Sequence, residues 1–291
     1  MYLSTHLIVP YFVTVQGEIK RPEHLIAWWS RIFSFYVPDE KDRIKLRFLC
    51  RLFRDALKPP PLYTTFPHPH YHSSLPQFMN RLNMLSEINI HTVPKILFLQ
   101  KKVFKLKNYL LINYPIKIIG AGQGQTIIQN GGIHIQETKE TNEKGKGNKR
   151  VELSEMTIRD AKSSGLYNNN GLSFLCDRMT FTRCSDSGVL VMNATGRLRN
   201  CMITQCADSG LVCIHKAFVE VEGSHTRIDG NVKNGGRSFY GLVCDSSSSI
   251  HLLLPLKKKV VATNNGGGGN YVKKWGMFWR GKILEVGAFG Q

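Results

Sequence analysis

The sequence predicts a mainly β protein, a solenoid of stacked coils preceded by a small α-helical module. A motif of Ser or Tyr, then Gly, then an aliphatic residue occurs at Ser164-Gly165-Leu166, Ser187-Gly188-Val189, Ser209-Gly210-Leu211 and Tyr240-Gly241-Leu242. The first three copies are 22–23 residues apart, and Met156-Thr157-Ile158 recurs at the same step as Met179-Thr180-Phe181. Short apolar runs alternate with Asn, Ser, Asp and Gly. Such a period indicates supersecondary units that bury their apolar side chains only against neighbouring units.

The helical module is expected at residues 21–58, whereas residues 1–20 have no assignable pattern. Leu46, Leu49, Phe53 and Leu57 follow one another at steps of three and four, which places them on one face of a helix. The prolines at 59–61 end this helix, because proline lacks the amide donor and clashes with the preceding turn.

Within this module, three groups of residues follow a recognisable order. Ile32-Phe33-Ser34-Phe35 is followed by Asp42, and then by Leu46-Arg47-Phe48-Leu49-Cys50-Arg51-Leu52-Phe53-Arg54. This order resembles the second half of an F-box, a short helical module that docks on the Skp-type adaptor of cullin–RING ubiquitin ligases. The resemblance implies that this adaptor is a partner. The residues expected to bind it are Pro22, Leu25, Ile32, Phe33, Leu46, Leu49 and Phe53.

The module departs from the F-box pattern near its start. The loop Tyr36–Lys41 is two residues longer than in the family, and Arg21-Pro22 stands where the family has Leu-Pro. The adaptor grips the first part of an F-box, so these departures bear directly on docking. The alternative is an ordinary helical pair that packs against the rest of the chain.

Residues 59–92 are expected to form a Pro/His-rich linker and a capping helix. The linker's alternating His68, His70 and His72 have no Cys or carboxylate nearby, so we expect polar linker residues rather than a metal site. Within Pro76–Ile90, Phe78, Leu82, Leu85 and Ile88 have helical spacing. A helix here would cover the exposed apolar end of the stack.

Strands are expected from residue 93 to residue 271. Ile118-Ile119-Gly120-Ala121-Gly122, followed by Thr126-Ile127-Ile128, resembles the opening coils of the pectin-lyase-like superfamily. The resemblance implies a right-handed, single-stranded parallel β-helix. We place regular coils at 151–172, 173–194, 195–217 and 218–247, with solvated loops at 137–150 and 232–239. Residues 272–291 are expected to be an irregular basic-aromatic tail.

Equivalent positions of successive coils should stack about 4.8 Å apart. Leu166, Val189, Leu211 and Leu242 are therefore expected to form one inner ladder. Cys184 and Cys206 also occupy equivalent positions, and Asn231 takes the same place one coil later. This arrangement favours buried free thiols over disulfides or zinc, and it indicates a reducing, intracellular setting, cytoplasmic or nuclear.

The formal net charge of +18 is the most unusual bulk property. It favours acidic partners, unless the basic residues are simply scattered over the surface. No basic stripe interleaved with aromatic residues is visible, so a nucleic-acid partner is not expected. No apolar run is long enough for a membrane span. No pattern calls for a cofactor or a metal.

Two acids are the candidates for catalysis. Asp186 and Asp208 stand at equivalent positions in consecutive coils, so stacking would bring them to about the spacing of a retaining glycosidase pair. Each lies in an Asp-Ser-Gly corner, where an Asx turn is the simpler role. The signatures of polygalacturonases and of lyases are absent, and no catalytic residue is assigned.

The sequence thus favours a non-enzymatic binding or adaptor protein whose β-helix recognises a protein or glycan target. The F-box resemblance would make it a substrate-recognition subunit of an SCF-type ubiquitin ligase. The alternative is a carbohydrate-active, pectin-lyase-like enzyme, a polysaccharide lyase or glycoside hydrolase, acting on an acidic polysaccharide. A third reading is a non-catalytic scaffold that the helical segment caps.

Overall fold

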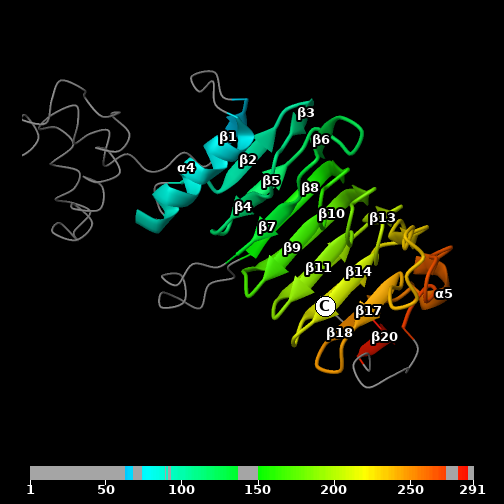
Figure 1. Ribbon diagram of the computed structural model, residues 1–291. Coiled ribbons are helices and arrows are strands. Elements are labelled where there is room, and N and C mark those ends of the chain that lie inside the picture. Colours follow the sequence, from blue (N-terminus) through cyan, green and yellow to red (C-terminus); the bar gives the residue numbers. More distant parts are fainter. Residues whose placement is uncertain are drawn as a thin grey trace, which may run out of the picture. The chain divides into compact units, whose positions relative to one another are not determined.

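A computed structural model of the chain describes residues 63–67, 74–88, 90, 93–136, 150–272 and 281–287. These residues belong to one unit, Pro60–Gln291. Their strands pair in parallel and stack coil upon coil (Figure 1). The predicted fold class, a mainly β right-handed β-helix, is confirmed.

Each coil contributes strands to three faces of the stack. The first face has the order β1-β2-β5-β8-β10-β12-β15-β18-β20. Its strands are β1 (Tyr63–Phe66), β2 (Ile96–Leu99), β5 (Lys117–Ile119), β8 (Arg150–Arg159), β10 (Ser173–Thr182), β12 (Thr195–Arg199), β15 (Phe218–Glu222), β18 (Ser249–Leu253) and β20 (Lys282–Val286).

The second face continues from the first through β8 and β10, which are long enough to belong to both. It also contains β3 (Lys102–Lys105), β6 (Thr126–Gln129), β13 (Met202–Thr204), β16 (Arg227–Asp229) and β19 (Ala262–Thr263). Within the two long strands, Glu155 (φ 59°) and Arg178 (φ 50°) adopt left-handed backbone conformations. The strand therefore turns the corner at these residues while its pairing continues on both sides.

The third face is a six-stranded sheet with the order β17-β14-β11-β9-β7-β4. Its strands are β4 (Leu110–Ile112), β7 (Ile133–Ile135), β9 (Leu166–Asn169), β11 (Val189–Met192), β14 (Leu211–Ile214) and β17 (Leu242–Cys244). Leu166, Val189, Leu211 and Leu242 are paired in register and fully buried. The predicted inner ladder is confirmed.

The corner before this sheet contains the predicted cysteine positions. Cys184 and Cys206 are buried free thiols, as are the other described cysteines. Asn231 is buried one coil later, and its amide is fully engaged. Asn231 Oδ1 accepts from Cys206 N at 3.0 Å, and Asn231 Nδ2 donates to Ile203 O at 3.0 Å and to Asn265 Oδ1 at 3.0 Å. The amide thus satisfies backbone groups that a thiol would leave without partners.

Helix α4 (Leu75–Ile88) covers the N-terminal end of the stack, as its apolar spacing predicts. It begins with a capping box, in which Gln77 N donates to Ser74 Oγ and Ser74 N donates to Gln77 Oε1. Phe78, Met79 and Leu82 are buried against the first coils. On the same helix, Asn83 Nδ2 donates to Leu111 O at 2.9 Å, which fixes the helix to β4.

Two short elements, β20 and α5 (Lys258–Val261), lie toward the C-terminal end of the stack. Strand β20 pairs with β18, so the sheet continues into residues 272–291, where the sequence predicts an irregular tail. Glu285 on β20 aligns with the buried Leu252, but its carboxylate instead accepts from Lys258 N at 2.8 Å at the start of α5. Glu285 is exposed, and a charged side chain on an edge strand discourages further strand addition.

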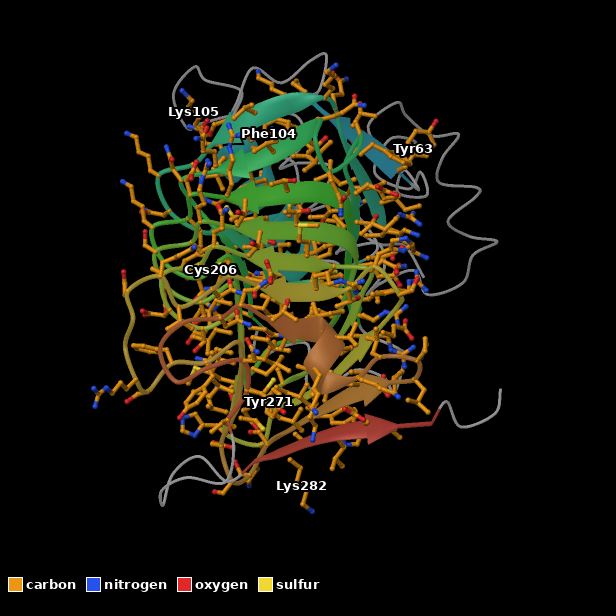
Figure 2. The ribbon with its side chains drawn as sticks, turned by 90° about the vertical axis from the view of Figure 1, so that its right-hand side faces the viewer. Tyr63, Phe104, Lys105, Cys206, Tyr271 and Lys282 are labelled. Atoms are coloured by element: carbon orange, nitrogen blue, oxygen red, sulfur yellow. The ribbon has the colours of Figure 1, made fainter. Side chains whose placement is uncertain are left out.

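The Pro/His-rich linker also differs in part from the expectation, because Tyr63–Phe66 forms β1 and extends the first face. Phe66 is buried, with its ring centroid 5.2 Å from that of Phe78. Figure 2 shows the rungs from Tyr63 and Phe104 at one end of the stack to Lys282 at the other. The F-box-like segment, the linker histidines and residues 137–149 lie outside the described residues.

Candidate binding surface

The outer side of the six-stranded sheet holds most of the candidate binding residues. Side chains alternate along each strand, so Tyr167 and Asn169 of β9 point outward while Leu166 and Asn168 are buried. Register places His134 of β7 and Leu190 of β11 on either side of Tyr167. We call this side of the sheet the third-face surface.

Three rings gather on this surface, and we call Tyr109, His134 and Tyr167 the aromatic cluster. The ring of His134 stacks on that of Tyr167 with centroids 4.7 Å apart, and Tyr109 lies 5.8 Å from His134 and 6.2 Å from Tyr167. Tyr109 occupies the space above Gly132, where a Cβ added to the glycine would come within 2.7 Å of its ring. Burial lowers the pKa of His134, so the neutral imidazole is favoured in the cluster.

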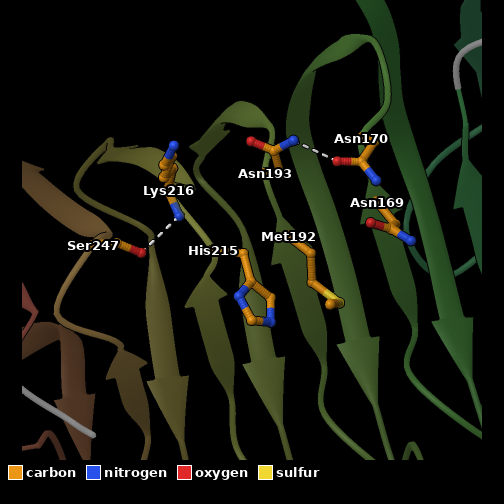
Figure 3. A pocket seen from close by; sticks show the side chains of 7 residues that line it. All are labelled: Asn169, Asn170, Met192, Asn193, His215, Lys216 and Ser247. Atoms are coloured by element: carbon orange, nitrogen blue, oxygen red, sulfur yellow. Dashed lines mark hydrogen bonds between the residues drawn. The ribbon is translucent and has the colours of Figure 1, made fainter.

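A groove of about 440 Å³ lies at the corner where β9, β11 and β14 end, and Asn169 in its lining is two residues from Tyr167 on β9. We call it the corner groove. Figure 3 shows its lining, which comes from four successive coils: Asn169, Asn170, Met192, Asn193, His215, Lys216 and Ser247. Asn193 Nδ2 donates to Asn170 Oδ1 of the preceding coil. The lining is therefore three amides beside one thioether, one imidazole, one ammonium group and one hydroxyl group.

The backbone at one end of the corner groove is held rigidly. His215 and Lys216 have φ of 56° and 66°, a left-handed conformation that is rare for residues other than glycine. The next coil stabilises it: His215 N donates to Asp245 Oδ2 at 2.7 Å, and Lys216 N donates to Ser247 Oγ at 2.9 Å. Hydrogen bonds from the neighbouring coil thus hold the groove wall before any ligand binds.

The two candidate acids lie at the opposite end of the same strands. Asp208 N donates to Asp186 O at 3.4 Å, so the two corners stack as predicted. Burial raises the pKa of Asp208, the amide of Asn234 lowers it, and the adjacent Asp186 carboxylate raises it further. Ser164 Oγ donates to Asp186 Oδ2 at 2.9 Å, and Ser164 N donates to the hydroxyl oxygen of Tyr109 at 3.1 Å. The acid pair is therefore linked to the aromatic cluster through Ser164.

The loop at residues 232–239 folds back onto the acid pair. Asn234 Nδ2 donates to Asp208 Oδ1 at 3.3 Å, and Val232 N donates to Asp208 O at 2.8 Å. The hydrogen bonds of both acids thus join neighbouring coils and this loop. They give the carboxylates a structural role at the corner, and the assignment of a catalytic role to Asp186 and Asp208 stays untested.

The first face carries ion pairs between neighbouring coils. Arg199 makes a bidentate pair with Asp177, with both N–O distances 3.0 Å, and Arg197 pairs with Glu220. Lys117 lies 3.7 Å from Glu152 on the same face. Each of these cations pairs with an acid of an adjacent coil, so the charges of these pairs are balanced on this face.

Among the described residues, no group of three or more His, Cys, Asp and Glu side chains is placed to hold a metal ion. The residues predicted to bind a Skp-type adaptor, namely Pro22, Leu25, Ile32, Phe33, Leu46, Leu49 and Phe53, lie outside the described part of the chain. The structure therefore brings together only the two acids of the sequence-based candidates.

Sequence reasoning missed the aromatic cluster and the corner groove. One signal was available, because Asn170 and Asn193 are one coil apart and stack on each other. The aromatic cluster left no such signal. Tyr109 and Tyr167 belong to coils separated by the insertion at 137–149, which interrupts the period.

Comparison with known proteins supports the fold. The family model described as right handed beta helix region matches residues 116–254. No curated protein and no solved structure matches the chain significantly. Within the part of the chain that the structure describes, no helix has the length and apolar character needed to cross a bilayer. Over residues 116–254 the chain is thus similar to the right-handed β-helix family, in agreement with its strand topology.

Proposed function

We propose that the chain is a non-catalytic binding protein that holds a glycan on its third-face surface. The observation that carries this proposal is the corner groove, an amide-lined hollow whose Asn169 lies two residues from Tyr167 of the aromatic cluster on the same outward side of β9. Pockets that combine apolar or aromatic side chains with a few placed polar groups are the usual form of a ligand site.

The lining suits hydroxyl groups. An Asn side chain both donates and accepts hydrogen bonds, as does a sugar hydroxyl, so each can satisfy the other. Asn169, Asn170 and Asn193 present such amides along one edge of the groove. Met192 and Tyr167 offer apolar surface for the C–H groups of a sugar ring.

Binding without catalysis accords with the surroundings of the acid pair. In a retaining glycosidase the scissile bond lies between two carboxyl groups about 5–5.5 Å apart. Here Ser164 Oγ donates to one oxygen of Asp186 and Asn234 Nδ2 donates to one oxygen of Asp208, so both carboxyl groups are engaged in hydrogen bonds at the corner.

The test is a matched pair of methionine variants. Met192→Ala removes apolar surface from the corner groove, whereas Met202→Ala removes a side chain that is 44% exposed on the second face. On an array of immobilised oligosaccharides, we expect wild type and Met202→Ala to bind the same glycans and Met192→Ala to bind several-fold more weakly. Equal binding by all three proteins, or no glycan bound by wild type, would refute the proposal. Thermal melting of each variant checks that the fold is retained.

We also propose that residues 21–58 recruit a Skp-type adaptor, on the strength of the F-box-like order of residues alone. Wild type should retain the purified adaptor in a pull-down at micromolar concentration, and Ile32→Asp with Phe33→Asp should lose it. If wild type retains no adaptor, the ubiquitin-ligase role is excluded and the chain is a glycan-binding β-helix without that function.

A further inference from the structure

We infer that the ligand of the third-face surface is an uncharged, extended β-linked glycan that runs along the solenoid axis with about one sugar per coil. This inference rests on the proposed function and specifies its ligand. The inferred ligand is uncharged, whereas the net charge of the sequence favours an acidic polymer.

The charges that border the third-face surface disfavour a polyanion. Asp186 and Asp208 lie at the entry to the strands, linked to Tyr109 through Ser164. At the exit, Lys216 is the only Lys or Arg among the described residues that line the corner groove, and the carboxylate of Asp245 is bound to the backbone of the adjacent His215. A polymer with one carboxylate or sulfate per sugar would need a cation at each coil, and the lining of the corner groove offers the single ammonium group of Lys216.

The basic excess of the described residues lies elsewhere. Between residues 93 and 136 there are six lysines and no acid, and four of them are on β3 or beside it: Lys101, Lys102, Lys105 and Lys107. Strand β3 is an edge strand, where lysines prevent pairing with another chain. Lys257, Lys258 and Lys259 lie at α5 on the other end of the stack. Much of the basic excess of the described residues therefore lies at the two ends of the stack, and these residues give no cationic row on the third-face surface.

The spacing of the groove favours a sugar polymer over a peptide. Its polar groups repeat once per coil, through Asn170, Asn193 and Lys216, and stacked strands are about 4.8 Å apart. An extended β-linked pyranose chain advances by nearly this length per residue. An extended peptide advances by about 3.3 Å per residue, so its side chains drift out of step with the coils.

The groove also sets the expected length of the bound segment. Its lining comes from four coils, represented by Asn170, Asn193, Lys216 and Ser247. Affinity should therefore rise from a disaccharide to a tetrasaccharide and then level off, because further sugars find no further groove residues.

The experiment is calorimetric titration of the full chain with soluble β-1,4-linked oligomers of glucose, N-acetylglucosamine, mannose, xylose and, as the charged comparison with the same linkage, mannuronate. We expect at least one neutral oligomer to bind with this dependence on length and the mannuronate oligomers to bind at least tenfold more weakly. Tighter binding of mannuronate would overturn the inference while leaving the proposed function intact. If neither class of glycan binds, or an extended peptide binds instead, the inference and the proposed function are both refuted.

Two asparagine variants locate the site. Asn193→Gly removes a groove amide at φ 46°, and Asn200→Gly removes an amide at φ 52° at another corner, where glycine accepts the same backbone. We expect Asn193→Gly to weaken the neutral oligomer about five- to tenfold, the effect of one lost hydrogen bond, and Asn200→Gly to leave affinity unchanged. Equal affinities for the two variants would contradict placement of the glycan in the corner groove.

Discussion

The glycine of the repeated motif is required by the distance between coils. A Cβ on Gly188 would lie 2.2 Å from Ile203 Cγ2 and 3.0 Å from Gly210 O. Gly165 and Gly210 meet similar obstacles from the adjacent coil. None of the three has a positive φ, so the constraint is close packing of successive coils rather than a special turn.

Gly188→Ala should therefore destabilise the protein by about 1–3 kcal/mol, the usual cost of forcing a methyl group into a packed core. Gly124 provides the control, because a Cβ there would meet nothing within 4 Å. Gly124→Ala should change stability by less than about 1 kcal/mol. Chemical unfolding of the two variants measures both values, and equal stabilities would show that the coils are less tightly packed at Gly188 than the structure indicates.

The acid pair predicts a dependence of stability on pH. Burial, and then the neighbouring Asp186, raise the pKa of Asp208, against a lowering by Asn234. A carboxyl group with a higher pKa in the folded chain binds protons more tightly there. Protonated Asp208 therefore stabilises the folded chain. This stabilisation is fully present below the unfolded pKa of about 3.9, and it declines as the pH rises through the folded pKa.

Asp208→Asn removes this titration while keeping an oxygen that can accept from Asn234. We expect the variant to gain stability over wild type at pH 7 and to lose that advantage at about pH 3. Urea unfolding at the two pH values measures the difference. An advantage of the same size at both would mean that the Asp208 charge has no effect.

At the scale of elements, helix α4 is the feature that seals the stack. Met79, on the inner side of this helix, is fully buried, whereas Met84 on the same helix is 57% exposed. Met79→Ala should cost about 2–5 kcal/mol, and Met84→Ala should fall within about 0.5 kcal/mol of wild type. Amide exchange of β4 should accelerate in Met79→Ala alone. Unchanged exchange in that variant would show that α4 does not stabilise the first coils.

The elements that sequence could predict are those that obey the period. The ladder through Leu166, Val189, Leu211 and Leu242 follows directly from the spacing of the motif, because parallel strands stack equivalent positions. β1 and β20 were missed for a physical reason. Tyr63–Phe66 lies in a proline-rich stretch and Lys282–Val286 in an irregular one, and each becomes a strand only because a neighbouring strand offers hydrogen bonds.

The candidate site was less predictable because it forms across coils. Asp186 and Asp208 share a motif, so their stacking could be foreseen. The corner groove combines Met192, His215 and Ser247, which share no motif, and their proximity comes only from the turns of three different coils. A single sequence records which residues stack, but not which stacked residues leave a hollow between them.

At the scale of the whole molecule, a solenoid of nearest-neighbour contacts should open from its ends. The buried cysteines report this, because burial raises the pKa of Cys176 and of Cys244, the latter to about 12, and suppresses reaction in the closed state. Cys244 lies nearer the C-terminal end of the stack than Cys176. We therefore compare the alkylation rate of each thiol in native buffer with its own rate in the unfolded chain. Relative to that reference, Cys244 should react faster than Cys176. Identical rates would indicate that the coils open as one unit.

The most direct test of glycan binding in the corner groove is to map where a neutral β-linked tetrasaccharide perturbs the amide resonances of the isotopically labelled chain. We predict changes confined to Tyr167–Asn170, Met192–Asn193 and His215–Lys216, including the side-chain amides of the asparagines. Changes centred on the ion-paired first face around Arg197 and Glu220, or no changes at saturating sugar, would contradict binding at the groove.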